Sequence, residues 1–223
     1  MIPLNDLNPT RRTPILTWAL IVLNVLIFLW ESSFAEGALM GVFTCISVVP
    51  AQAVAAPFAL ETQLDVLRSM FLHGSWAHLI GNMLYLYLFG DNVEDRFGSV
   101  RYLLFYIAAG LAASFAQYAV NPASSIPNVG ASGAIAGVLG AYILMFPKAR
   151  VDVLLGRQVV AMPAFIVLGF WIVLQLVSGV GSIADTAQTE TGGVAYMAHV
   201  GGFVAGLVLG VLFGGLRRPD RIA

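Results

Sequence analysis

The chain has 223 residues, of which 59% are hydrophobic and only 10% are charged. Because soluble domains carry about 25% charged residues, this composition excludes an ordinary soluble domain and indicates a single integral membrane domain over residues 1–223. The net charge of −1 leaves no basic surface of the kind that binds nucleic acid. The single cysteine excludes an intrachain disulfide and a cysteine-based metal site.

Six apolar runs are long enough to predict membrane-spanning helices, which need about 20 residues, or fewer where the flanks reach the interface. The runs cover residues 14–31, 77–92, 101–120, 132–147, 159–179 and 194–215. We therefore expect an all-α membrane protein built as a six-helix bundle. No small-residue cleavage site follows the first run, so we interpret it as a retained span. The polar connection 32–76 predicts a large structured loop at the external membrane surface.

The positions of Lys and Arg predict the orientation of the spans. Ten of the eleven fall on one side of a six-span chain, and only Arg68 falls on the other. The positive-inside rule then places both termini in the cytoplasm. A solvated cytoplasmic turn is expected from the end of the second span onward, formed by Asn92, Glu94, Asp95, Arg96 and Arg101.

Four polar side chains are predicted at a similar depth in the external halves of three spans. Ser132 begins the fourth span, His199 lies about five residues inside the sixth, and His78 and Asn82 share one face of the second. Polar residues inside a membrane are costly and indicate function. Ser132 is a candidate nucleophile and His199 a candidate general base, since a neutral imidazole can take the proton of a hydroxyl group.

Small residues on the fourth and sixth spans predict a close helix–helix contact. The glycines at helical spacing are Gly133, Gly137, Gly140, Gly202, Gly206 and Gly210. Such residues let two backbones approach closely. Helix packing alone would account for Ser132, but the same packing would also bring its hydroxyl group to His199.

An oxyanion site is predicted beside this pair. His78 and Asn82 can donate hydrogen bonds, and the backbone N–H groups of Ala131 and Ser132 lie at the start of a helix, where the dipole is positive. Donors of this kind stabilise a developing oxyanion. His73 precedes His78 by five residues and is expected above the membrane, where it anchors the loop.

These motifs resemble those of the rhomboid intramembrane serine proteases. The matching elements are GASG around Ser132, the His73-x4-His78-x3-Asn82 pattern and AHVGG around His199. The resemblance covers nearly the whole chain and implies a six-helix core that cleaves membrane proteins in or near their transmembrane segments. It implies a Ser132–His199 dyad and an oxyanion pair of His78 and Asn82.

The resemblance also matches Gly130 to the glycine that precedes the nucleophile motif, and Gly133 is expected to be structural beside it. It implies no metal or other cofactor, and it implies single-span or other membrane proteins and the lipid bilayer as partners. The oligomeric state is left open. We expect a multi-pass protein of a bacterial inner membrane, with its active site open to the external side.

One position departs from the family pattern. Some members carry a tyrosine four residues after the serine, which stacks on the histidine, whereas this chain has Ala136. Tyr196 or backbone contacts are the alternatives for orienting His199. No span holds a carboxylate at its depth, which predicts a dyad; the nearest external acids are Asp185 and Glu190. The loop 180–193 and the outer half of the fifth span are expected to form a cap and side gate.

Other protease classes do not fit the sequence. A zinc protease needs His-Glu-x-x-His, an aspartyl protease needs two span carboxylates, and the Gly-x-Ser-x-Gly nucleophile elbow fails at Ala134. Two alternatives from other classes stay open. One is a non-catalytic relative that binds and escorts membrane proteins, and the other is a passive channel for small solutes.

Overall fold

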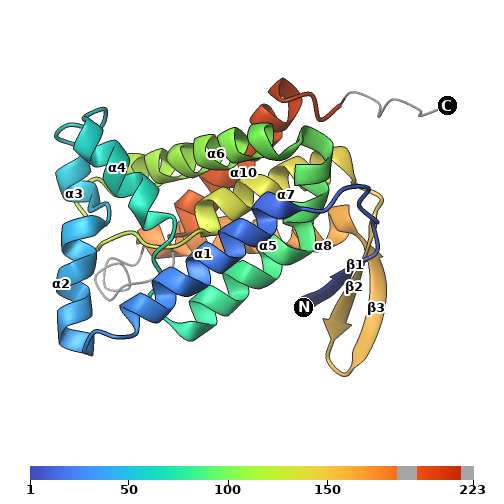
Figure 1. The fold of residues 1–223 in the computed structure, drawn as a ribbon, viewed down its shortest axis with the longest axis horizontal. Helices are drawn as coiled ribbons and strands as arrows, with labels where there is room; N and C mark the ends of the chain where they lie inside the picture. The colour runs from blue at the N-terminus through green and yellow to red at the C-terminus, as the bar shows by residue number, and fades with distance from the viewer. Residues whose placement is uncertain (185–194, 217–223) are drawn as a thin grey trace.

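The structure is a computed structural model that describes residues 1–184 and 195–216. The described chain forms a bundle of six long helices (Figure 1). They are α1 (Ile15–Glu31), α5 (Trp76–Phe97), α6 (Ser99–Val120), α7 (Ser132–Met145), α8 (Ala164–Ala184) and α10 (Tyr196–Leu212). Helix α7 lies at the centre, where every residue from Gly133 to Tyr142 is buried. Helices α5, α6, α8 and α10 pack against the element that begins with Ser132.

A three-stranded antiparallel sheet lies at one end of the bundle, so the all-α prediction is wrong in this respect. Strands β1 (Ile2–Asp6), β2 (Arg150–Leu155) and β3 (Gln158–Pro163) pair in the order β1-β2-β3. Val153 pairs with Pro3 on one side and Val160 on the other. Val151 and Val153 are fully buried, so the sheet is packed onto the helices.

The fifth predicted span is wrong at its start, because residues 158–163 form strand β3 and the helix begins only at Ala164. Hydropathy does not distinguish a short apolar strand from the first turns of a helix. Gly156, with a φ of 60°, sits in the turn of a hairpin, and the following valines favour a strand. Among the described residues, two helices are long and apolar enough to cross a membrane, namely Ser99–Val120 and Ala164–Gly181.

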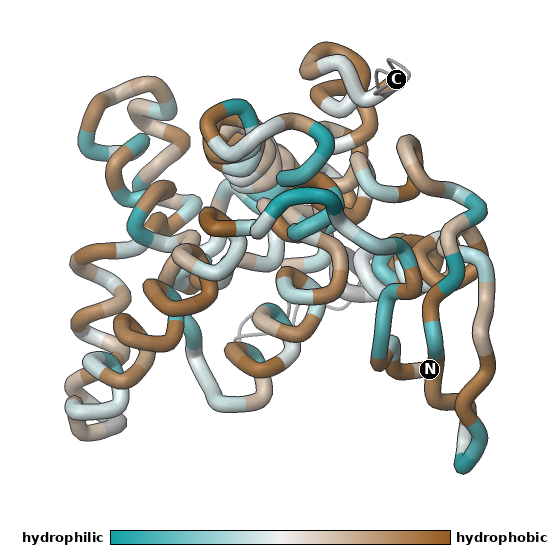
Figure 2. The backbone as a smooth tube through the Cα atoms, turned by 45° about the vertical axis from the view of Figure 1, so that its right-hand side comes forward, coloured by the Kyte–Doolittle hydropathy of each residue, from teal (hydrophilic) through white to brown (hydrophobic). Residues whose placement is uncertain are grey.

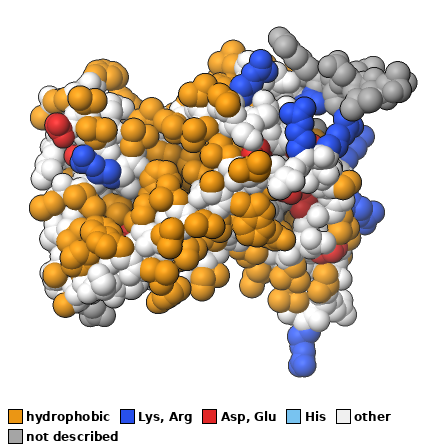
Figure 3. Space-filling model, in the orientation of Figure 1, with side chains coloured by type: hydrophobic (Ala, Val, Ile, Leu, Met, Phe, Trp, Pro, Cys, Tyr) orange, Lys and Arg blue, Asp and Glu red, His pale blue; other side chains and the backbone are white. Residues whose placement is uncertain are grey.

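The outer surface of the bundle is apolar. Figure 2 shows hydrophobic residues recurring along the helices, and Leu26, Val173 and Val177 are more than half exposed. In the view of Figure 3, Lys and Arg side chains gather mainly at the end that carries the strands. An apolar surface with basic residues concentrated at one end is typical of a membrane domain.

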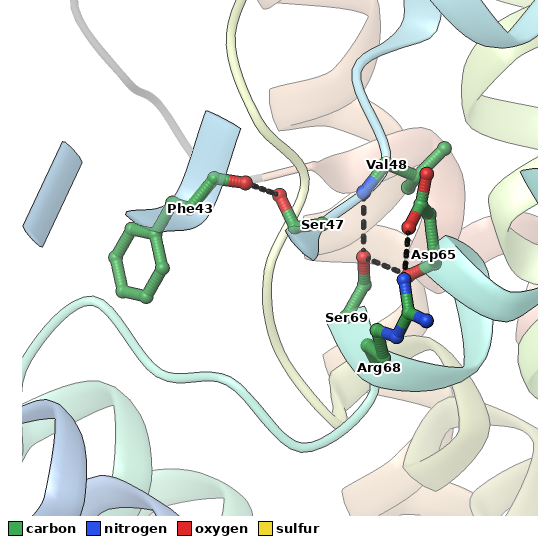
Figure 4. A network of polar contacts seen from close by, with 6 residues as sticks. All are labelled: Phe43, Ser47, Val48, Asp65, Arg68 and Ser69. Atoms are coloured by element: carbon green, nitrogen blue, oxygen red, sulfur yellow. Dashed lines mark hydrogen bonds and ion pairs between the residues drawn. The ribbon is translucent and has the colours of Figure 1, made fainter. Parts of the chain in front are cut away.

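The connection between α1 and α5 forms three helices at the opposite end from the sheet (Figure 1). They are α2 (Glu36–Ile46), α3 (Pro50–Ala53) and α4 (Leu60–Ser69). Figure 4 shows the Ser69 hydroxyl accepting the Val48 N–H at 2.8 Å and donating to the Asp65 carbonyl at 2.6 Å. Val48 forms a bridge with Asn128, and the Ser69 carbonyl accepts the Gly130 N–H at 2.8 Å. The connection between α1 and α5 thus holds in place the segment that leads into α7.

The predicted solvated turn is wrong, because Asn92 and Glu94 lie within α5, which continues to Phe97, and both are buried. The Glu94 carboxylate accepts the backbone N–H groups of Leu16 and Thr17 at 3.0 and 2.7 Å, and the Thr17 and Ser99 hydroxyl groups at 2.8 and 2.6 Å. Helix α1 has no side-chain cap of its own, and its first N–H groups need acceptors. Glu94 supplies them from a neighbouring helix, which the sequence pattern did not reveal.

Candidate active site

The start of α7 brings Gly130, Ser132 and His78 together. Gly130 has a φ of 131°, a conformation that favours glycine. A Cβ atom at Gly130 would lie 2.7 Å from the His78 ring and 3.5 Å from the Ser132 Oγ atom. Only a residue without a side chain therefore leaves room for the imidazole here. No side chain caps α7 at Ala131, so its first N–H groups remain available as donors.

Glycines bring α7 and α10 into backbone contact. A Cβ atom at Gly202 would overlap the carbonyl oxygen of Gly133, and one at Gly206 would overlap that of Gly137. Two of the expected glycine pairs thus face each other across the helices. Gly140 packs instead against the backbone of Phe203. This contact aligns the first turn of α10, which carries His199, with the first turn of α7.

His199 is buried and held by side chains from α8. Its Nδ1 atom lies 2.8 Å from the Oε1 atom of Gln175. The ring of Trp171 lies 5.8 Å from the imidazole, centroid to centroid, at an interplanar angle of 37°, and Tyr196 lies edge-on at 6.4 Å. Sequence reasoning considered Tyr196 but missed Gln175 and Trp171. An amide within an apolar run was the signal that could have identified Gln175.

Asn82 is held by His73. The Asn82 amide nitrogen donates to the Nε2 atom of His73 at 2.9 Å, and the Nδ1 atom of His73 lies 3.3 Å from the Phe71 carbonyl oxygen. The backbone N–H of His73 donates to both Glu31 carboxylate oxygens at 3.1 and 3.2 Å. Burial, and next the charge of the nearby His78, lowers the pKa of His73 to about 4. A neutral His73 ring can accept the Asn82 hydrogen bond.

A cavity of about 830 Å³ joins the four predicted polar residues, since Ser132, His199, His78 and Asn82 all line it. This volume is within the range of small-molecule and cofactor sites. Within the described part of the chain, no hydrogen bond joins Ser132 to His199; in unliganded enzymes such bonds are often long and tighten when substrate binds.

The described residues contain no cluster of three metal-ligating side chains. The predicted cap, loop 180–193, lies outside the described residues from position 185 onward.

The structure thus defines a helical bundle with an apolar surface and a cavity lined by a serine, two histidines and an asparagine. Residues 61–216 match the family model described as Rhomboid domain, and the chain belongs to the rhomboid family. Proteins of this family are integral membrane proteins.

Relatives come from bacteria and from organelles. Rhomboid protease GluP of Bacillus subtilis is 34% identical over 148 residues, which cover 66% of this chain and 26% of that protein. Rhomboid-like protein 11, chloroplastic, of Arabidopsis thaliana is 30% identical over 64% of this chain and 50% of its own length. The human presenilin-associated rhomboid-like protein, mitochondrial, is 29% identical over 67% and 37%. The similarity thus spans a quarter to a half of these relatives.

Proposed function

We propose that the chain is an intramembrane serine endopeptidase that hydrolyses peptide bonds in or near transmembrane segments of membrane-protein substrates. The observation that carries this proposal is the cavity lined jointly by Ser132, His199, His78 and Asn82. Membership of the rhomboid family, which includes a relative named as a protease, supports it. Substrates with helix-weakening residues near the cut fit best, since a regular helix keeps its carbonyl groups hydrogen-bonded.

In the proposed reaction, the Ser132 Oγ atom attacks the scissile carbonyl carbon while its proton passes to the Nε2 atom of His199. His78, Asn82 and the first N–H groups of α7 donate to the resulting oxyanion. The imidazolium then gives its proton to the leaving amine as the C–N bond breaks. Water, deprotonated by the neutral His199, hydrolyses the acyl-enzyme and returns Ser132 to its starting state.

The proposed site is a dyad without an acidic third member. The partner of the His199 ring nitrogen is a neutral amide, and in the described chain no carboxylate contacts the imidazole. Asp185 and Glu190, the external acids named from the sequence, lie outside the described residues. Replacing either with its amide is expected to retain most activity.

We further propose six membrane spans with both termini in the cytoplasm and the cavity open to the external side. The concentration of Lys and Arg at the sheet end supports this orientation (Figure 3). A bacterial inner membrane is the proposed location. A reporter fused after Ala223 should report a cytoplasmic C-terminus, and an external one would contradict the orientation.

The test is cleavage of a model single-span substrate by the purified protein in proteoliposomes. Ser132→Ala and His199→Ala should each abolish cleavage, and the double variant should be no worse than either, because a nucleophile and its base act as a unit. Labelling by a fluorophosphonate should require Ser132. Substantial cleavage by Ser132→Ala, or strictly additive losses, would rule out the dyad. Absence of cleavage by the wild type would favour a non-catalytic escort function.

A further inference from the structure

Helix α8 meets α10 along a narrow seam. Trp171, Gln175 and Gly179 follow one another at four-residue intervals and so share a helix face. Trp171 and Gln175 contact His199, and a Cβ atom at Gly179 would lie 3.2 Å from that of Tyr196. On the opposite face of α8, Val173 and Val177 are more than half exposed. The outer half of α8 therefore faces its neighbour chiefly through residues around His199.

Gln175 is an unusual residue for this helix. Its neighbours Leu174 and Leu176 are 45% and 43% exposed on an apolar surface, where an amide without a partner would be costly. Its Oε1 atom instead lies 2.8 Å from the Nδ1 atom of His199. An amide oxygen only accepts hydrogen bonds, so the Nδ1 atom must carry the ring proton. The Nε2 atom is then left with a free lone pair.

We infer that Gln175 is a positioning residue, which fixes the Nδ1–H tautomer of His199 and so leaves Nε2 free to act as the base for Ser132. This inference rests on the proposed function for its catalytic meaning, but the tautomer itself does not depend on it. Gln175 takes the place that a carboxylate holds in a triad. A neutral amide does this without the cost of a charge at membrane depth.

The first measurement is the tautomer, read from the ¹⁵N chemical shifts of His199 in the full-length protein. We expect the Nδ1–H form in the wild type and a mixture of both forms in Gln175→Met, which keeps the side-chain length and removes the acceptor. An Nε2–H tautomer in the wild type would overturn the inference whether or not the chain cleaves any substrate. The wild-type measurement is decisive without any variant that could misfold.

The second measurement is kinetic. Gln175→Met should lower kcat by roughly 10- to 100-fold, by analogy with the hydrogen-bond partners of metal-binding histidines. KM should change little, and fluorophosphonate labelling of Ser132 should slow in proportion. Gln175→Glu keeps an acceptor oxygen and should lose less. Unchanged kcat and labelling in a folded Gln175→Met variant would overturn the inference. Loss of cleavage in the wild type itself would refute the proposed function instead.

Gln117 provides a matched control on the other side of α10. Its Oε1 atom accepts the backbone N–H of Ala198 at 3.2 Å, so it supports the helix without touching the imidazole. Gln117→Met should leave the His199 tautomer unchanged. If Gln117→Met shifts the tautomer equally, the His199 tautomer depends on the general stability of α10 and not on the Gln175 acceptor.

Discussion

The Asn82 amide has two N–H groups, and His73 accepts one of them at 2.9 Å. The second N–H group can donate to a group bound in the cavity. Asn82 is therefore held in place and still has a donor for the oxyanion. We predict that Asn82→Ala and His78→Ala each lower turnover by about 10²–10³-fold, the usual cost of one oxyanion donor. Single-turnover cleavage measures this, and fluorophosphonate labelling of Ser132 should still occur, although slowly. Wild-type rates in both variants would show that neither side chain serves the oxyanion.

At the same scale, the sequence allowed part of the site to be predicted. Ser132, His199, His78 and Asn82 were predicted to lie together because their residue types are rare in apolar spans and their predicted depths agree, and all four line one cavity. Gln175 could not be paired with His199, because that pairing depends on the rotation of α8 about its axis. The apolar residues around α8 leave that rotation undetermined.

At the scale of helices, the contact between α7 and α10 depends on glycines with no spare volume. We predict that Gly206→Ala destabilises the protein by more than the 1–3 kcal/mol typical of overpacking, because the new Cβ would meet a backbone carbonyl group. Thermal unfolding in detergent measures this effect. Gly169→Ala on α8 is the control, since nothing lies within 4 Å of its Cβ position. Equal effects of the two substitutions would refute the close contact.

Glu94 is a second test at this scale, since it caps α1 from α5. Replacing it with alanine leaves the first N–H groups of α1 without that acceptor, and we predict a loss of about 1–3 kcal/mol in the free energy of unfolding. The control is the neighbouring Asp95→Ala, because Asp95 accepts the Arg11 N–H in an exposed bond of 3.3 Å. If both substitutions cost the same, the buried cap contributes nothing specific.

The helices and the sheet differ in how far the sequence predicts them. Each long helix lies within or close to a predicted apolar run, because hydropathy and length are local properties of the chain. The sheet was missed because β1 has only five residues, and its partner β2 begins 144 positions after Asp6. A pairing over that distance leaves no periodic signal within either segment.

For the whole molecule, Asp6 joins the sheet to the bundle. Its Oδ2 atom accepts the Tyr142 hydroxyl at 2.8 Å and the Asn92 amide at 2.9 Å. Burial raises the pKa of Asp6 to about 7, and the charge of Asp91 adds to the increase. The folded state therefore holds a proton that the unfolded state releases above about pH 4. The resulting stability is complete at low pH and is lost as the pH rises through 7.

Because the stability contributed by Asp6 falls as the pH rises, we predict that β1 is bound to the rest of the protein more stably at pH 6 than at pH 8. Hydrogen-exchange protection factors of the β1 amides and of Leu7, whose N–H donates to the Arg150 carbonyl, should fall between these two values. Asp6→Asn cannot ionise and should remove the dependence. Persistence of the same pH dependence in Asp6→Asn would assign it to another group.

The sheet also constrains the order in which the protein assembles. Strand β1 is translated first, but β2 and β3 follow only after four of the long helices have been made. At synthesis rates of about 5–20 residues per second, roughly 7–30 s pass between the translation of β1 and that of its partner β2. During that interval its backbone donors and acceptors are open to water or to a chaperone. Closure of the sheet is thus a late event in biogenesis, which ties the first residues of the chain to a bundle already two-thirds built.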